Sequence, residues 1–346
     1  MSDKISVGVL GATGTVGQMF INLLRDHPWF EVKEIAASDR SRGSVYSALM
    51  NDRWKMTSLI PAGIEGMIVK GCDDDLSSKI LFSGLDSSVA GEIEEFYAQK
   101  GHIVISNSRN HRMGEHVPLL VPEVNHDHTG LLKYQNRRGK IVTNPNCSTV
   151  GMVLALAPIE KKFGIDKIIV TTMQALSGAG YPGVPSMDIL DNLIPYISGE
   201  EPKMETETLK LFGKLEDGKI KFADIKISAS CNRVAITDGH TECISFSLKN
   251  KASIEDLKNE IKQFNPLKDM KLPSAPNPPV IITEQENRPQ PRYDRNRSNG
   301  MSAVMGRLRE CPVLGYKMTI LSHNTIRGAA GCAILNAELL KAKGLI

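Results

Sequence analysis

Short apolar runs alternate with amphipathic stretches through the first 150 residues. We predict buried strands at residues 5–10, 32–37, 80–85, 103–106 and 141–142. Between the first two runs, Phe20, Leu23 and Leu24 share one helical face until His27-Pro28 ends the helix, and Ala90–Lys100 predicts a second helix. Strands that alternate with helices are typical of an α/β fold with a doubly wound parallel sheet. Residues 44–75 show no clear period.

The pattern changes after residue 165. We predict strands with one solvated face at residues 168–176, 225–229 and 241–248, and helices at residues 253–264 and 329–342. Residues 186–212 are predicted to be largely helical, with breaks at Pro195 and Pro202. Three segments are predicted as irregular connections: 177–185, 265–279 and 287–300. This half of the chain therefore predicts a second, α+β domain.

Composition narrows the class of protein. A length of 346 residues suggests two domains, and 41% hydrophobic with 23% charged residues is typical of globular proteins. A formal charge of +3 argues against nucleic-acid binding. No apolar run reaches the roughly 20 residues that a membrane span needs, and we expect no signal peptide. The cysteines lack metal-ligand spacing, so we expect reduced thiols in the cytoplasm and no metal site.

A glycine-rich segment directly follows the first predicted strand and opens the first helix. Here glycines allow a tight turn and close approach of the backbone to a pyrophosphate, which the helix N-terminus favours. The alternative is a plain turn, but the strand–loop–helix context favours a dinucleotide site. The predicted cofactor contacts in this segment are Gly11, Thr13, Gly14, Thr15, Val16 and Gly17.

The end of the second strand bears on the choice between NAD and NADP. A carboxylate there, such as Asp39, would hold a ribose 2′-hydroxyl, whereas serine and arginine side chains would bind a 2′-phosphate. Ser38, Arg40 and Ser41 favour NADP. The alternative is a solvated loop. Ser83, at another strand end, and Ser177 and Gly178, in the Gly- and Pro-rich loop, are further candidate cofactor contacts.

Cys147 lies where the strand at 141–142 turns into an apolar helix. Unpaired N–H groups and the dipole at a helix N-terminus favour an anion, so we predict a lowered pKa for this thiol. His240 downstream supplies a possible proton acceptor, which makes Cys147 a candidate nucleophile. The alternative for Cys147 is a buried structural cysteine, and the alternative for His240 is a hydrogen-bonded turn histidine after Asp238-Gly239. For Arg233 the alternative is a solvated strand end.

Five motifs occur in an order that resembles the aspartate-β-semialdehyde dehydrogenase family, in its archaeal and fungal branch. They begin at Gly11, Asn144, Gln174, Asn232 and His323, and read GATGTVG, NPNCST, QALSGAG, NRV…GHTE and HNTIRG. The resemblance covers essentially the whole chain. It implies an NADP-dependent enzyme that forms a homodimer or homotetramer through its second domain.

The resemblance also implies roles for individual residues. Cys147 would form an acyl-enzyme, with His240 as acid/base and with Gln174 and Asn146 beside the thiolate. Arg233 would hold the substrate carboxylate, Arg112 and Lys203 the phosphate, and Glu200 the amino group. Glu201, Glu205 and Glu207 stand close to Glu200 and leave that last assignment open. Asn324 joins the predicted cofactor contacts.

The implied reaction is reductive dephosphorylation of L-aspartyl 4-phosphate to L-aspartate 4-semialdehyde, a step toward lysine, threonine and methionine. We expect an NADP-binding domain of residues 1–147 plus 324–346 and a catalytic and dimerisation domain of residues 148–323. Alternatives are an acyl-CoA reductase such as malonyl-CoA reductase, and the more distant N-acetyl-glutamyl-phosphate reductase. A non-catalytic NADP-binding sensor or scaffold is a third alternative.

Overall fold

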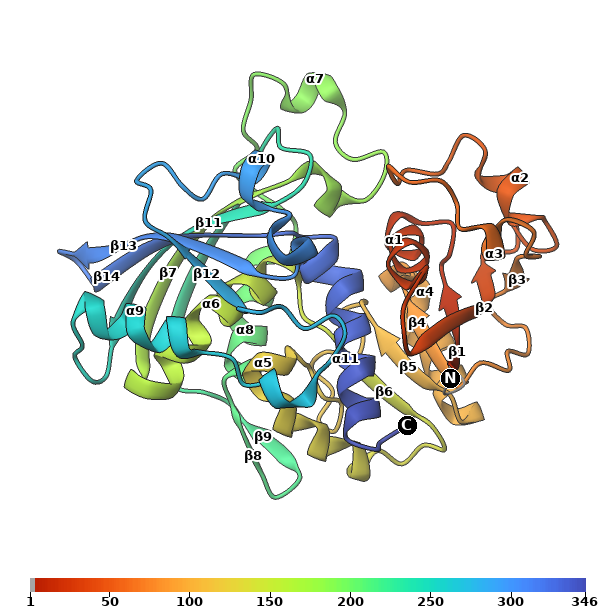
Figure 1. Cartoon of the computed structure of the whole chain (residues 1–346), viewed down its shortest axis with the longest axis horizontal. Coiled ribbons are helices and arrows are strands. Elements are labelled where there is room, and N and C mark those ends of the chain that lie inside the picture. Colours follow the sequence, from red (N-terminus) through yellow and green to blue (C-terminus); the bar gives the residue numbers. More distant parts are fainter. Residues whose placement is uncertain (1–3) are drawn as a thin grey trace.

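Two six-stranded sheets form two units that lie side by side, with helix α11 between them (Figure 1). The structure is a computed structural model and describes residues 4–346. The first sheet occupies the N-terminal part of the chain and the second sheet the part after residue 165.

The first sheet is parallel throughout and has the strand order β3-β2-β1-β4-β5-β6. Its strands are β1 (Ile5–Leu10), β2 (Phe30–Ala37), β3 (Lys70–Gly71), β4 (Ile80–Ser83), β5 (Ile103–Ser106) and β6 (Lys140–Thr143). The connecting helices are α1 (Thr15–Leu24), α2 (Tyr46–Met50), α3 (Ala62–Glu65), α4 (Ser87–Lys100), α5 (Pro122–Asn125) and the 3₁₀ segment η1 (His126–Tyr134). The predicted α/β class and doubly wound sheet are confirmed.

Because these strands are parallel, their carboxyl ends meet at one edge of the sheet, where open α/β sheets bind ligands. The glycine loop, the Ser38–Ser41 segment, Asn107 and Cys147 all follow such strand ends. The apolar strands and helix faces below this edge pack around Phe20, Phe30 and Phe82, whose rings contact one another. The core thus holds the candidate site residues at a common edge.

The C-terminal helix α11 (Gly331–Ala342) packs against this first core rather than against the second sheet. A π-helical turn, η5 (Ile326–Ala330), leads into it. In that turn Arg327 forms a bidentate ion pair with Glu123 of α5, with N···O distances of 2.8 and 2.7 Å. Both side chains are fully buried, so removing either partner would leave an uncompensated charge.

The second sheet is mixed and has the order β10-β7-β11-β14-β13-β12. Its strands are β7 (Ile165–Gln174), β10 (Lys226–Arg233), β11 (His240–Leu248), β12 (Val280–Thr283), β13 (Ala303–Cys311) and β14 (Gly315–Ser322). The remaining elements are a hairpin of β8 (Lys214–Glu216) and β9 (Lys219–Lys221), helices α7 (Ser186–Ile189), α8 (Glu200–Leu211), α9 (Ile254–Gln263) and α10 (Pro291–Asp294), and 3₁₀ turns η2 (Leu176–Ala179), η3 (Lys268–Met270) and η4 (Arg297–Gly300).

Two features of this unit differ from the sequence prediction. Strands β12, β13 and β14 were not predicted, although β13 and β14 form a long antiparallel pair in the middle of the sheet. Residues 190–199 are not helical, so the predicted helix over 186–212 is confirmed only at its two ends, in α7 and α8. The predicted break at Pro202 is wrong, because Pro202 lies in the first turn of α8, where a missing backbone N–H is tolerated. Pro195 and a left-handed Gly199 separate α8 from the preceding segment.

Helix α6 (Cys147–Phe163) joins the two units. It follows the last strand of the first sheet and packs on β7, β11, β13 and β14 of the second. Every residue from Ser148 to Ile159 is buried, in keeping with a helix that is apolar on nearly all sides. Its first residue, Cys147, therefore lies where the edge of the first sheet meets the second sheet.

Candidate active site

The N-terminus of α6 is capped by Asn146. Its Oδ1 atom accepts hydrogen bonds from the backbone N–H groups of Ser148 and Thr149, at 3.0 and 3.4 Å. Its Nδ2 atom donates to Oε2 of Glu200 on α8 at 2.8 Å. Asn146 therefore both caps the helix that carries Cys147 and connects that helix to α8.

His240 lies beside the thiol, with 3.2 Å between its Nε2 atom and Sγ of Cys147. The other ring nitrogen, Nδ1, accepts a hydrogen bond from the backbone N–H of Ala175 at 3.0 Å. A peptide N–H can only donate, so Nδ1 carries no proton. The neutral ring therefore carries its proton on Nε2 and directs it at the sulfur.

The electrostatics of this pair correct the prediction of a lowered thiol pKa. Burial raises the pKa of the Cys147 thiol to about 12, and Glu200 adds to the effect while Arg112, Arg233 and Lys203 oppose it. Burial, assisted by Arg233 and His323, lowers the pKa of His240 to about 3. Loss of hydration disfavours both charged forms and outweighs the helix terminus, so the free protein holds a neutral thiol and a neutral imidazole.

Arg233, Gln174 and His240 come together because their strands are neighbours. Arg233 and Gln174 are cross-strand partners at the ends of β10 and β7, and His240 begins the adjacent strand β11. Nη1 of Arg233 donates to the carbonyl oxygen of Ala175 at 2.7 Å. A Cβ atom on Gly178 would lie 2.9 Å from Nη1 of Arg233 and 3.1 Å from Cε1 of His240, so a larger residue there would displace the guanidinium.

Arg112 lies on the loop that follows β5, as predicted. Its Nη1 atom donates to Oε1 of Glu207 at 2.9 Å, and its Nη2 atom donates to the carbonyl oxygen of Asn107 at 2.7 Å. Its Nε–H is buried and has no partner within residues 4–346. Two of the five N–H groups of the guanidinium are therefore engaged by the protein, and the second N–H groups on Nη1 and Nη2 remain for an anionic ligand.

The four neighbouring glutamates of α8 have different hydrogen-bond partners in the structure. Glu200 pairs with Lys203, with 2.8 Å between Oε1 and Nζ, and contacts Asn146. Glu201 and Glu205 instead accept backbone N–H groups of strand β10, from Cys231 and Ala229. Glu207 contacts Arg112 and the backbone of Asn146. Only Glu200 and Glu207 therefore face Cys147.

The glycine loop has the geometry that a dinucleotide phosphate needs. Gly11 has a φ of +76°, and a Cβ atom there would lie 2.8 Å from the carbonyl oxygen of Gly84. A Cβ atom on Gly17 would lie 2.2 Å from the carbonyl oxygen of Gly11. The N-cap of α1, Gly14, supplies no side-chain cap, which leaves the N–H groups of the first turn open to an anion.

The other predicted cofactor residues differ in their exposure and in whether their polar groups already have partners in the protein. Ser38 and Arg40 are exposed, and Arg40 has no ion-pair partner in the described part of the chain; Ser41 is buried. Ser177 and Asn324 meet, with 2.8 Å between Oγ and Nδ2. Ser83 is fully buried and its hydroxyl donates to Glu94 at 2.6 Å, which argues against a cofactor contact through that group.

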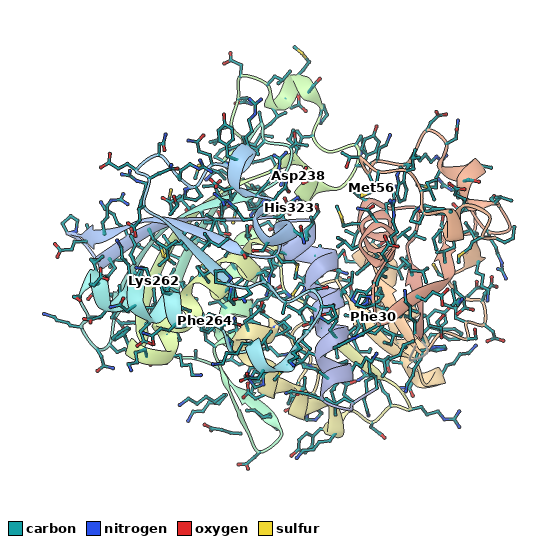
Figure 2. The ribbon with its side chains drawn as sticks, viewed as in Figure 1. Phe30, Met56, Asp238, Lys262, Phe264 and His323 are labelled. Atoms are coloured by element: carbon teal, nitrogen blue, oxygen red, sulfur yellow. The ribbon has the colours of Figure 1, made fainter. Side chains whose placement is uncertain are left out.

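A cavity of about 610 Å³ lies between the two units. It extends from Thr15, at the start of α1, to Ser177, and its wall includes Met56 of the first unit and Asp238 and His323 of the second, all three of which are labelled in Figure 2. Because Thr15 and Ser177 are both predicted cofactor contacts, this cavity is a candidate cofactor site between the glycine loop and the loop after β7.

Two other classes of site are not found in the described residues. Within 4–346, no cluster of three or more His, Cys, Asp or Glu side chains could hold a metal ion. No helix in the same range is both long and apolar enough to cross a membrane.

Comparison with known proteins identifies the family. The family described as "Semialdehyde dehydrogenase, NAD binding domain" matches residues 6–131, and "Semialdehyde dehydrogenase, dimerisation domain" matches residues 156–327. An aspartate-semialdehyde dehydrogenase of Archaeoglobus fulgidus is 47% identical over 97% of this chain and 98% of the relative. The chain belongs to the aspartate-semialdehyde dehydrogenase family.

Two further relatives agree with this family. The aspartate-semialdehyde dehydrogenase of Saccharomyces cerevisiae is 47% identical over the full length of both chains. The crystal structure of the Candida albicans aspartate-semialdehyde dehydrogenase with NADP has a TM-score of 0.91 and 42% identity, covering 99% of this chain and 100% of that one. The resemblance to the archaeal and fungal branch is therefore confirmed.

Sequence reasoning missed two residues of the site and one backbone group. Glu207 had appeared only as an alternative to Glu200, and Lys210 had not appeared. The signal for both is the repetition of Glu-x-x-Lys seven residues after Glu200-x-x-Lys203. No pattern in the sequence indicates the backbone of Ala175, which holds both His240 and Arg233.

The neutral state of the Cys147–His240 pair predicts the pH dependence of thiol alkylation in the free protein. The raised thiol pKa means that the thiolate fraction, and with it the rate, should rise about tenfold per pH unit from about pH 7 to beyond pH 9. Iodoacetamide labelling followed by mass spectrometry of the Cys147 peptide measures the rate, with the exposed Cys243 as internal reference. A rate that reached a plateau below about pH 8 would indicate a preformed thiolate and contradict the prediction.

Proposed function

We propose that the protein catalyses the reversible, NADP-dependent reductive dephosphorylation of L-aspartyl 4-phosphate to L-aspartate 4-semialdehyde. The observation that carries this proposal is the 3.2 Å contact between Cys147 and His240, with arginines on two sides of it. Membership of the family supports the substrate. The bound nicotinamide cofactor supplies or accepts the hydride.

In the reductive direction, Cys147 attacks the acyl carbon and phosphate leaves, which gives a thioester on Sγ. Transfer of hydride to the thioester carbon and departure of the sulfur then release the semialdehyde. A sulfur nucleophile suits both steps of the reaction, because it attacks a carbonyl carbon readily and also leaves readily from a tetrahedral carbon. The neutral thiol of the free protein must lose its proton before it attacks.

His240 stabilises negative charge in this scheme by donating from Nε2. The same N–H can serve the thiolate and the carbonyl oxygen, on which charge develops as hydride arrives. Accepting a proton at Nε2 requires the ring to shift its existing proton to Nδ1 and give up the contact with Ala175. An acid/base role, as the family resemblance implies, therefore includes a rearrangement at Ala175.

The charged side chains around the thiol divide between the two ends of the substrate. We infer that Arg233 binds the carboxylate of the amino-acid end, that Arg112 and Lys203 bind phosphate, and that Glu200 binds the amino group. The guanidinium of Arg112, with only two of its five N–H groups engaged by the protein, supports a phosphate contact. Gln174 and Asn146 complete the surroundings of the thiol.

NADP is held, in this proposal, by the glycine loop at Gly11, Thr13, Gly14, Thr15, Val16 and Gly17, and by Ser177, Gly178 and Asn324. Ser38, Arg40 and Ser41 receive the 2′-phosphate. The open N-terminus of α1 and the free guanidinium of Arg40 support these assignments.

We also infer an assembly of two or four copies. The family match to a dimerisation domain at residues 156–327 supports a homodimer or homotetramer, which light scattering would distinguish from a monomer. The two largest hydrophobic clusters support a division into residues 1–147 plus 324–346 and residues 148–323, with Leu267, Leu272 and Met301 of the second segment packed into the first cluster. The six free cysteines support a cytoplasmic location, which cell fractionation would test.

Two assays separate the proposed reaction from its nearest alternative. The purified protein should reduce NADP⁺ with aspartate semialdehyde in a reaction that requires phosphate, and should not oxidise NADPH with malonyl-CoA. The variant Cys147→Ala should lose turnover and keep its affinity for NADP. The turnover of Cys147→Ser should fall by orders of magnitude because an alcohol is barely ionised at neutral pH. The reverse preference would establish an acyl-CoA reductase, and absence of both reactions would favour a non-catalytic NADP-binding protein.

The role of Arg40 predicts a selective loss of NADP affinity. Replacing Arg40 by Ala removes a charge-assisted hydrogen bond to the 2′-phosphate, so the Kd for NADP should rise about tenfold or more. The Kd for NAD, which lacks that phosphate, should change little. Fluorescence titration with each cofactor measures both constants. An equal loss for the two cofactors would show that Arg40 does not meet the 2′-phosphate.

The two arginines predict that each substitution raises the Michaelis constant of a different substrate. Arg233→Leu should raise the KM for the semialdehyde and lower kcat, because a misplaced carbonyl no longer meets Cys147 in line. Arg112→Leu should mainly raise the KM for phosphate. Arg233→Lys should restore only part of the loss, since an ammonium lacks the planar two-donor fork. An unchanged phosphate KM in Arg112→Leu, with each substrate varied in turn, would refute the assignment of the phosphate site.

A further inference from the structure

Helix α8 carries the sequence Glu-x-x-Lys twice, at Glu200 and Lys203 and again at Glu207 and Lys210. With 3.6 residues per turn, positions three, seven and ten residues apart lie along one side of a helix. Both members of the second pair are 2% exposed, so it is more deeply buried than the first. Long charged side chains are rarely buried unless their charges are fully paired.

The carboxylate of Glu207 connects two parts of the candidate active site. Its Oε1 atom accepts from Nη1 of Arg112 at 2.9 Å, and its Oε2 atom accepts from the backbone N–H of Asn146 at 2.6 Å. Arg112 belongs to the loop after β5, whereas Asn146 immediately precedes Cys147. One carboxylate therefore spans the distance between the arginine and the segment that positions the thiol.

The ammonium group of Lys210 holds the main chain of the Arg112 loop. Its Nζ atom donates to the carbonyl oxygens of Arg112, Gly114 and Val117, at 2.7, 2.9 and 2.9 Å. All three of its donors are therefore used, and none is directed at a ligand. Lys210 fixes the loop backbone while Glu207, one turn earlier on the same helix, orients the guanidinium.

We propose that Glu207 is a positioning residue that sets the orientation of the Arg112 guanidinium relative to the Cys147 sulfur. The inference rests on the proposed function, in which Arg112 binds the phosphate that leaves when Cys147 attacks. Two of the five N–H groups of Arg112 are held by Glu207 and by the Asn107 carbonyl, and the second N–H groups on Nη1 and Nη2 remain for the ligand. A guanidinium held at two points presents those donors in one direction, as an in-line displacement requires.

A charge-preserving substitution separates positioning from electrostatic attraction. Glu207→Asp keeps the negative charge but shortens the side chain by one methylene, so the carboxylate cannot span both partners. Glu207→Gln keeps the length and removes the charge, and its amide can accept from only one of the two donors. The matched control is Glu205→Asp on the same helix, because Glu205 also accepts a backbone N–H but from Ala229, on strand β10.

We expect Glu207→Asp to raise the KM for phosphate about tenfold and to lower kcat by a similar factor, with the KM for the semialdehyde changed by less than about twofold. Glu205→Asp should change no constant by more than about twofold. Steady-state kinetics in the phosphate-consuming direction, with each substrate varied in turn, measure these values. Circular dichroism and the Kd for NADP verify that each variant is folded.

The opposite results overturn the proposal. If Glu207 acted through charge alone, Glu207→Asp would leave the phosphate KM unchanged and Glu207→Gln would lower it, since a negative charge near the anion would be gone. If Glu207→Asp does not fold, the Glu207→Gln variant distinguishes the two roles. A raised KM for phosphate in that variant supports a positioning role, and a lowered KM refutes it. A wild-type protein without phosphate-dependent activity would instead refute the proposed function itself, so the two failures are distinguishable.

Discussion

Burial of the Cys147–His240 pair, complete for the imidazole and partial for the thiol, is the constraint on which the arrangement of the site depends. Burial is the largest cause that raises the pKa of the thiol and lowers that of the imidazole, so neither group is charged in the free protein. Any anion formed at the sulfur therefore needs fixed positive groups and oriented N–H donors in place of water. Arg112, Arg233 and Lys203 supply the positive charge, and Nε2 of His240 supplies the nearest donor.

Those charged side chains are themselves buried or half-buried, so each needs a partner of its own. Arg112 pairs with Glu207, Lys203 with Glu200, and Arg233 with the carbonyl oxygen of Ala175. Such partners hold the side chains in one geometry and leave some donors free, as at the second N–H groups of Nη1 and Nη2 of Arg112. A ligand phosphate or carboxylate can then complete hydrogen bonding that the protein leaves incomplete, without first ordering flexible side chains.

The sequence predicted the parts of the structure that local patterns determine. The parallel sheet followed from apolar runs separated by amphipathic stretches, and the placement of Cys147 at a helix N-terminus followed from the Asn-Pro break before it. Strands β13 and β14 were missed because β13 carries Arg307, Arg309 and Glu310 within an otherwise buried strand, which interrupts the apolar signal. Their pairing depends on contacts between strands, which a single sequence does not display.

The direction of the thiol pKa shift was wrong for a related reason. A helix terminus is visible in the sequence, whereas the loss of hydration depends on tertiary packing around the sulfur, to which His240 of β11 contributes. The predicted residues Asn146, Arg112, Lys203 and Glu200 do meet around Cys147, yet the sequence could not separate Glu200 from its neighbours. That distinction depends on which side of α8 faces β10 and which side faces α6.

Helix α8 shows why periodicity alone does not reveal such a site. Met204 and Leu211 form an apolar stripe that enters the neighbouring hydrophobic clusters. Beside it runs a second stripe of Glu200, Lys203, Glu207 and Lys210, which a pattern of polar positions would assign to solvent. That stripe instead faces the edge of the first sheet. It has two acidic and two basic side chains, so its net formal charge is zero. The helix thus carries carboxylates that contact Arg112 and Asn146, and ammonium groups that contact Glu200 and the loop after β5, without an excess charge that burial would oppose.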